Sequence, residues 1–198
     1  MLNLKDVKNN SQILEFIKQT EIAMEALSYT NHGLRHSNLV SERAMQIAKA
    51  IGLNQREGEL AAIAGFCHDM GNFMTRTLHH HFGAILFHQV FSGKVEPREL
   101  SLIMQAVSNH DKDEMNFVHA ISAVLVLADK SDVDRSRVTQ KNLEKVKTDI
   151  HDRVNYAARE SIIKIKKPSS AKATEGRGKM TLALKIDTNF CPIIEYFE

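Results

Sequence analysis

Histidine and aspartate residues stand at the ends of several segments whose apolar spacing is typical of helices. The chain has ten histidines among 198 residues, and most of them lie between positions 32 and 119. His36 opens one such segment, the pair His68-Asp69 closes another, and Asp129 ends the most apolar one. Burying an ionised carboxylate or an unpaired imidazole is costly unless the group has a partner. A divalent cation would satisfy several of these groups at once.

Further donors of the same kind stand at the triplet His79-His80-His81 and at the pair His110-Asp111. A mixed set of imidazole nitrogens and carboxylate oxygens suits an ion of Fe, Mn, Zn or Mg. Such an ion polarises a phosphoryl oxygen and lowers the pKa of a water, which gives a nucleophile near neutral pH. The residue types therefore predict a metal centre with hydrolytic chemistry.

Helices must bring these residues together, because the apolar residues between them recur at helical spacing. Asn54 and Pro97 are typical of helix starts, and Gly52 is typical of a helix end. The segment 117–130 is apolar nearly all round, so we expect it at the centre of the fold. We predict helices over residues 11–28, 34–51, 54–70, 79–91, 96–109, 117–130 and 139–157.

The pattern changes to a period of two near the C-terminus. Residues 161–166 and 179–187 alternate between apolar and polar positions, which indicates strands, and a polar loop joins them. We therefore expect a mainly α fold, with a helical domain over residues 1–157 and a small β-hairpin extension over 158–198. The end of the chain on Phe197 and Glu198 suggests that this extension is truncated.

Composition narrows the function classes. The net charge of +2, the absence of Trp and an aromatic content of 6% do not favour nucleic-acid binding. No apolar run approaches the roughly 20 residues that span a bilayer, and the first residues do not have the pattern of a signal peptide. Two cysteines do not suggest a disulfide framework. These features predict a cytoplasmic protein without a membrane partner.

The order of the donors, His, His-Asp, His, His and Asp, resembles that of the HD-domain superfamily of metal-dependent phosphohydrolases. The fragments that carry the resemblance are LRHSNLV, GFCHDMGN, HHHFGAIL, VSNHD and LVLADKSD. The resemblance implies an HD-domain helical bundle in which His36, His68, Asp69 and Asp129 bind one metal ion. His68 and Asp69 then belong to the catalytic centre.

The binuclear branch of that superfamily adds a second ion, which Asp69 would share with the first. His110 matches one further ligand. The other is His79 or His80: a Gly-Ala pair four residues after His79 favours that residue, and a small local shift would favour His80. His32 is a candidate outer ligand. The chain departs from the cyclic-di-nucleotide branch, because no GYP motif follows His110.

The basic residues that follow Asp129 are candidates for holding a substrate phosphate. They are Lys130, Arg135 and Arg137, although this charged run could equally be a solvated loop. We expect hydrolysis of a phosphate mono- or diester, with a small nucleotide as the favoured substrate and Lys130 offsetting developing charge.

Two other functions stay open at the level of sequence. The first is oxidative chemistry at a di-iron site, which some HD-fold proteins carry out with O₂. The second is a metal-stabilised module that senses a nucleotide without turnover and uses the hairpin to recruit a partner. A homodimer is compatible with either function.

Overall fold

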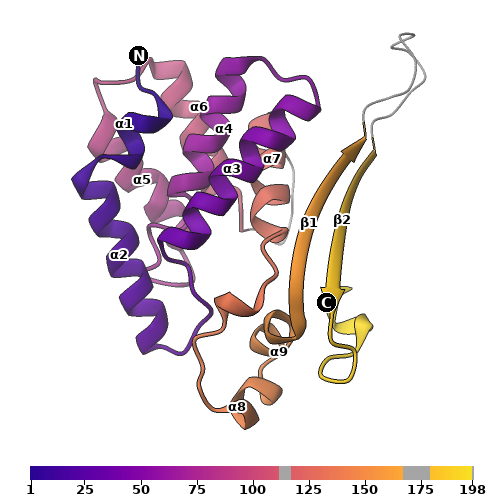
Figure 1. The fold of residues 1–198 in the computed structure, drawn as a ribbon. Helices are drawn as coiled ribbons and strands as arrows, with labels where there is room; N and C mark the ends of the chain where they lie inside the picture. The colour runs from indigo at the N-terminus through magenta and orange to yellow at the C-terminus, as the bar shows by residue number, and fades with distance from the viewer. Residues whose placement is uncertain (112–116, 167–178, 198) are drawn as a thin grey trace.

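The computed structural model describes residues 1–111, 117–166 and 179–197. Helices form one body of the molecule, and a two-stranded sheet lies beside it (Figure 1). This arrangement confirms the mainly α fold with a C-terminal hairpin. The helices before the hairpin are α1 (Leu4–Lys8), α2 (Ser11–Ala26), α3 (Leu34–Ala50), α4 (Gln55–Cys67), α5 (His79–Phe91), α6 (Pro97–Ser108), α7 (Ala120–Lys130), the short 3₁₀ helix η1 (Arg135–Arg137), α8 (Leu143–Thr148) and α9 (Ile150–Ala157).

Local sequence signals set the helix boundaries in the bundle. Asn54 caps α4 in a reciprocal capping box with Glu57, and Pro97 is the first residue of α6. Gly52 follows α3 with a φ of 87°, a left-handed conformation that glycine adopts without strain. The predicted helices from residue 11 to residue 130 are confirmed, and Asn10 caps α2 with its side chain.

The prediction of one helix over residues 139–157 was wrong. The chain forms two short helices, α8 and α9, with Asp149 in an extended conformation between them. Asn142 caps α8 and Asp149 caps α9 with their side chains. Side chains of this kind compete with the backbone for hydrogen bonds, so they start helices more readily than they continue them. The apolar spacing did not reveal this break.

The hydrophobic core lies between α3, α4, α6 and α7. α3 packs along α4, and α7 contacts α3, α4 and α6, which confirms the central position expected for it. Ile47, Ile63, Ile121 and Leu125 are fully buried there. Because α3, α4 and α7 share this core, their ends are held in fixed relation to one another.

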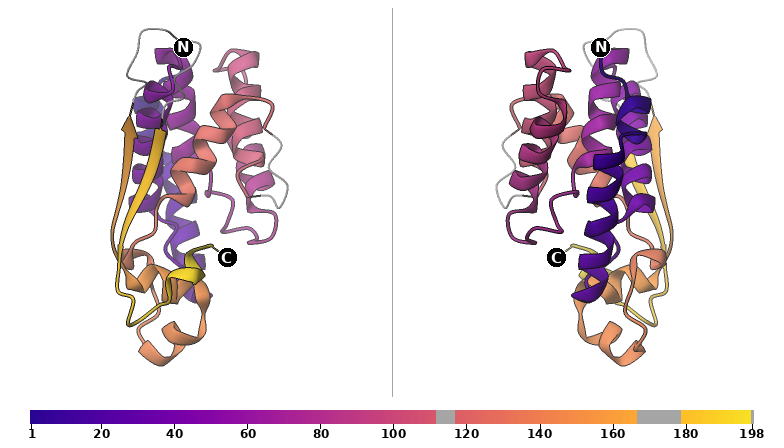
Figure 2. Two further views of the ribbon diagram at one scale, coloured as in Figure 1. Left: turned by 90° about the vertical axis from the view of Figure 1, so that its right-hand side faces the viewer. Right: turned by 90° about the vertical axis from the view of Figure 1, so that its left-hand side faces the viewer.

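The hairpin consists of β1 (Ala158–Lys166) and β2 (Lys179–Ile186), which pair antiparallel, and the 3₁₀ helix η2 (Ile193–Phe197) follows it. The predicted polar loop between the strands lies outside the described residues. Figure 2 shows the hairpin along the outside of the bundle, on the side away from α5 and α6. Ile163 and Ile165 pack against the core, and Arg43 donates a 2.7 Å hydrogen bond to the carbonyl oxygen of Ser161. β1 is therefore the strand that attaches the hairpin to α3.

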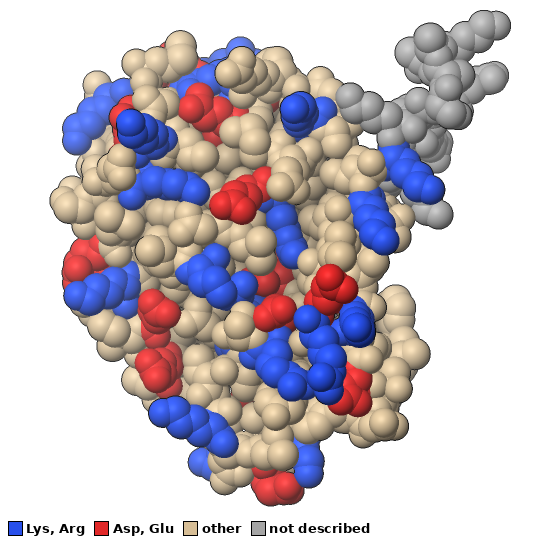
Figure 3. Space-filling model, viewed as in Figure 1, with Lys and Arg blue, Asp and Glu red and all other residues tan. Residues whose placement is uncertain are grey.

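Charges on the surface are mixed in sign. Lys and Arg lie interspersed with Asp and Glu over the face shown in Figure 3, most densely where the bundle meets the lower end of the hairpin. Among the described residues, every helix is too short or too polar to cross a bilayer.

Candidate metal centre

Three helices of the core bring the first four predicted ligands to one point. His36 lies in the first turn of α3, His68 caps the C-terminal end of α4, and Asp129 lies in the last turn of α7. Asp69 follows His68 directly. All four residues are buried, with at most 6% of their surface exposed. Packing of the helices in the core therefore sets the position of this group.

The first donor set consists of the Nε2 atoms of His36 and His68, Oδ2 of Asp69 and Oδ1 of Asp129. His36 Nε2 lies 3.2 Å from His68 Nε2, 3.3 Å from the Asp69 oxygen and 3.2 Å from the Asp129 oxygen. His68 Nε2 lies 3.1 and 3.5 Å from the same two oxygens. A metal ion about 2.0–2.2 Å from each ligand would place neighbouring donors about 3.0–3.4 Å apart. The donor atoms of His36, His68 and Asp69 lie close enough together to hold a single ion, and the Asp129 oxygen lies within 3.5 Å of both imidazole nitrogens.

The second donor set uses the other oxygen of the same carboxylate. Oδ1 of Asp69 lies 3.2 Å from Nε2 of His79 and 3.6 Å from Nε2 of His110. The two imidazole nitrogens are 3.1 Å apart. Asp69 thus presents one oxygen to each set.

Hydrogen bonds at the opposite ring nitrogens fix the direction of the lone pairs. Nδ1 of His68, His79 and His110 each lies 2.7–2.8 Å from a backbone carbonyl oxygen, and Nδ1 of His36 lies 2.7 Å from a carboxylate oxygen of Asp132. These oxygens only accept, so each Nδ1 donates and each Nε2 of the neutral ring keeps its lone pair. Both donor sets therefore consist of converging acceptors, which a cation would satisfy.

The ionised carboxylates of Asp69 and Asp129 favour a positive charge between the ligands. Burial raises the pKa of Asp69, but the charge of His68 and hydrogen bonds from other imidazoles outweigh it, and the pKa lies well below its usual range. Asp129 is also ionised, because Lys130 and the ligand histidines outweigh the effect of burial on its pKa. Burial lowers the pKa of His68, yet the carboxylates raise it to about 10, so a cation that binds here displaces a proton from its Nε2.

Two glycines allow α4 and α5 to approach closely enough to build the second set. A Cβ atom at Gly71 would overlap the backbone of His79 and of Gly83, and one at Gly83 would press on the carbonyl oxygen of His68. The loop after Asp69 can therefore lie directly on the first turn of α5. This contact brings His79 to the shared carboxylate.

His80 and His32 lie beside the centre and outside the two donor sets. His80 is buried, its Nδ1 has no hydrogen-bond partner among the described residues, and burial lowers its pKa to about 4. Its Nδ1 is thus not oriented by a carbonyl as that of His79 is. Nε2 of His32 lies 3.9 Å from Asp69 and accepts a hydrogen bond from Arg137, so its lone pair is already used.

The predicted phosphate-binding residues occupy different surroundings. Lys130 is 53% exposed, with Nζ 3.2 Å from Oδ2 of Asp129 and 3.7 Å from Oδ1 of Asp111. Arg137 is 12% exposed and donates to the carbonyl oxygen of Asp132. Arg135 contacts Tyr156 instead. Its Nε donates to the carbonyl oxygen of Tyr156, and its guanidinium lies 4.2 Å from the centre of the Tyr156 ring.

Sequence reasoning missed three residues that lie against the ligands: Asp132 and Asn72 hydrogen-bond to them, and Arg76 places a positive charge beside His79. Asp132 accepts from His36 and also binds the guanidinium of Arg35. The side-chain amide of Asn72 donates a 3.0 Å hydrogen bond to Oδ1 of Asp69, and Arg76 lies 3.0 Å from Nδ1 of His79. The signal for Asp132 was a second acid three residues after Asp129, at the end of the same helix.

A cavity of about 1170 Å³ opens onto the centre. Asp69, His79, His110 and Asp129 line one part of it together with Lys130. The remaining wall comes from the end of α2, from α8 and α9, from β2 and from η2. The hairpin and the last helices thus enclose the space in front of the metal centre.

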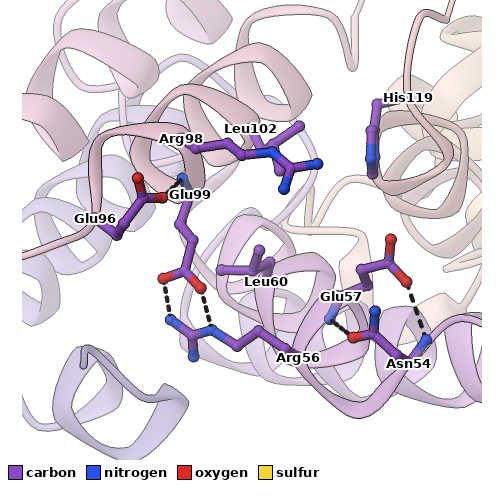
Figure 4. A pocket seen from close by; sticks show the side chains of 9 residues that line it. All are labelled: Asn54, Arg56, Glu57, Leu60, Glu96, Arg98, Glu99, Leu102 and His119. Carbon is purple, nitrogen blue, oxygen red and sulfur yellow. Dashed lines mark hydrogen bonds and ion pairs between the residues drawn. The ribbon is translucent and has the colours of Figure 1, made fainter.

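A second cavity, of about 250 Å³, lies between the first turns of α4 and α6 (Figure 4). Its main feature is the bidentate pair of Arg56 with Glu99, and Nε of Arg56 lies 2.6 Å from the carboxylate. Twelve residues of helix separate Arg56 from His68, which is roughly 18 Å at the rise of an α-helix. This ion pair is structural and has no part in the metal centre.

Comparison with known proteins agrees with this geometry. The sequence pattern of the HD domain matches residues 33–157, more than half of the chain. Neither the curated proteins nor the solved structures give a significant match. The matched range begins just before His36 and includes every residue of the two donor sets. The chain therefore belongs to the HD domain family, a family of metal-dependent hydrolases.

Proposed function

We propose that this protein is a binuclear, metal-dependent phosphohydrolase that acts on a small phosphate mono- or diester, with a nucleotide as the substrate class. The observation that carries the proposal is the orientation of Asp69, whose two oxygens belong to two different donor sets. Two divalent ions held in this way polarise phosphoryl oxygens and supply an activated water. His36, His68 and Asp129 complete the first set, and His79 and His110 complete the second.

Basic side chains next to the donor sets would hold the phosphate group. The charge of Asp129 raises the pKa of Lys130, so this ammonium group stays protonated at neutral pH. Its Nζ lies at the wall of the cavity, where it can donate to a phosphoryl oxygen and offset developing charge. Arg76 and Arg137 line the same cavity. Arg135 does not, so it has no role in this proposal.

The size of the cavity supports a substrate with a substantial organic part. Small-molecule sites commonly have volumes of about 300–1,000 Å³, and this cavity reaches about 1170 Å³. Inorganic phosphate alone would leave most of this space unfilled. A nucleotide would place its phosphate at the donor sets and its nucleoside against the wall formed by α9 and the hairpin.

The test is release of inorganic phosphate from a nucleotide panel by protein loaded in turn with Mn²⁺, Fe²⁺, Zn²⁺ and Mg²⁺. We expect turnover with at least one metal, and a loss of about a hundredfold in kcat/KM for Lys130→Met with unchanged metal content. Lys147→Met is a matched control, because the ammonium group of Lys147 pairs with Glu144 on α8 and with no other side chain in the described part of the chain. Absence of phosphate release with all four metals would refute the proposal, and O₂ uptake by the iron form would favour oxidative chemistry.

A further inference from the structure

The wall opposite the phosphate-binding residues contains an acid that the proposed chemistry does not use. Asp152 lies in the first turn of α9 and is only 5% exposed. It nevertheless lines the large cavity. A carboxylate in this position is costly to bury unless something pairs with it.

The backbone does not provide that pairing. Asp152 is the third residue of α9, where an acid commonly accepts a hydrogen bond from the N–H of the N-cap residue. Here the N-cap is Asp149, and its N–H donates to the carbonyl oxygen of Lys145 instead. Asp149 accepts from the N–H of Asp152, which fixes the start of the helix without using the Asp152 carboxylate.

Three neighbouring polar side chains of this wall are already engaged. Asn155 accepts from the N–H of Asp134 and donates to His151, Glu195 pairs with Arg153, and Tyr196 donates to the carbonyl oxygen of Val154. The Asp152 side chain has no hydrogen bond or ion pair with any described residue. Burial and the charge of Asp149 raise its pKa. This carboxyl group is therefore available to a ligand in the cavity.

The surroundings of Asp152 indicate which ligand would use it. Ile150 and Val154 of α9 and Leu182 and Leu184 of β2 line the same cavity with apolar side chains. Apolar side chains beside an unpaired hydrogen-bond acceptor suit a flat heterocycle or a sugar that carries N–H or O–H groups. It does not suit a second phosphate, which would meet a carboxylate.

We propose that Asp152 recognises the nucleoside part of the substrate by accepting a hydrogen bond from one of its N–H or O–H groups. This inference rests on the proposed function for the substrate class. Asp152 is a specificity-determining residue in this scheme and takes no part in the chemistry at phosphorus. The extended segment at Asp149 that separates α8 from α9 is what turns it toward the cavity.

The experiment measures the binding of adenosine, guanosine, cytidine and uridine to the metal-loaded protein by calorimetry. Nucleosides carry no phosphate, so their binding does not depend on turnover. We expect the best-bound nucleoside to lose at least tenfold in affinity in Asp152→Asn, because the charged acceptor is lost. Glu144→Gln is the matched control, since Glu144 is 80% exposed on α8 and outside the cavity; its affinities should equal those of the wild type.

A second measurement separates recognition from a general disturbance of the site. Hydrolysis of p-nitrophenyl phosphate, which offers no donor group, should stay within twofold in Asp152→Asn, and the metal content and melting temperature should not change. Equal nucleoside affinities in Asp152→Asn and the wild type, or no nucleoside binding by the wild type, would overturn the inference. If nucleosides bind as expected but no phosphate is released from nucleotides, only the proposed hydrolysis fails.

Discussion

The two donor sets share Asp69 but differ in the groups that hydrogen-bond to the Nδ1 atoms of their histidines. In the first set, His36 is backed by the carboxylate of Asp132, and Asp129 adds a second anionic ligand. In the second set, His79 and His110 are backed by backbone carbonyls, and the shared carboxylate is the only anion among the three ligands. The guanidinium of Arg76 also lies beside His79.

This difference in charge has a consequence for affinity. A carboxylate behind a ligating imidazole raises its basicity and holds the ring more firmly than a neutral carbonyl does. A nearby guanidinium repels a cation. We therefore expect the first set to bind its ion more tightly than the second, so that the protein passes through a one-metal state as metal is removed.

Removing the shared ligand should have the largest effect. Asp69→Ala takes one donor from each set, so we expect loss of both ions and of detectable phosphate release. The helix content should be retained, because the side chain is at the end of α4 and outside the apolar core. Elemental analysis and far-UV circular dichroism measure the two properties. Retention of both ions in this variant would contradict the bridging role.

Single ligand changes should separate the two sets. We expect His110→Ala to retain one ion per chain and His36→Ala to lose the more tightly held ion, with hydrolysis reduced at least a hundredfold in both. Metal titration with Mn²⁺ or Zn²⁺ gives the stoichiometry and the dissociation constants. If His110→Ala lost the tighter ion, the order of affinities proposed here would be reversed.

Changing Asp132, the residue that accepts a hydrogen bond from His36, should have a smaller effect on metal affinity, and only in the first set. Asp132→Asn keeps a hydrogen-bond acceptor for His36 but removes its charge. Changes of this kind typically weaken metal binding about 10–100-fold. We expect that loss in the dissociation constant of the tighter ion and little change in the weaker one. Asp134→Asn, which removes a nearby acid that caps η1, serves as the control.

The smallest effect is expected at Arg76. Arg76→Gln removes the positive charge beside His79, so the weaker ion should bind up to about fivefold more tightly, the scale of a partly exposed charge pair. The KM for the phosphate ester should rise in the same variant if Arg76 also holds substrate. An unchanged second dissociation constant would show that the guanidinium does not influence the second set.

Much of this arrangement could be predicted from residue order alone. Apolar spacing and caps such as Asn54 and Pro97 determine where helices form, because these signals act within a few residues. The types of the donors, histidine and aspartate at helix ends, indicated a metal centre before any coordinates. The alternation on both sides of the polar loop predicted the hairpin.

Three-dimensional packing decided the rest. Sequence favoured His79 and kept His80 as an alternative, and in the structure the contact of α5 with Gly71 brings His79 to Asp69. Asp132 could not be recognised as the partner of His36, because 96 residues separate them. The position of Asp152 follows from a break at Asp149 that a helical spacing conceals.

Local sequence thus determined the helices and the kinds of donor that they carry. Only the tertiary structure decided which donors lie close together and which group hydrogen-bonds to each of them. The physical reason is the range of the interactions: a cap acts over three or four residues, whereas an ion-binding group forms only when several helix ends are held together by a common core.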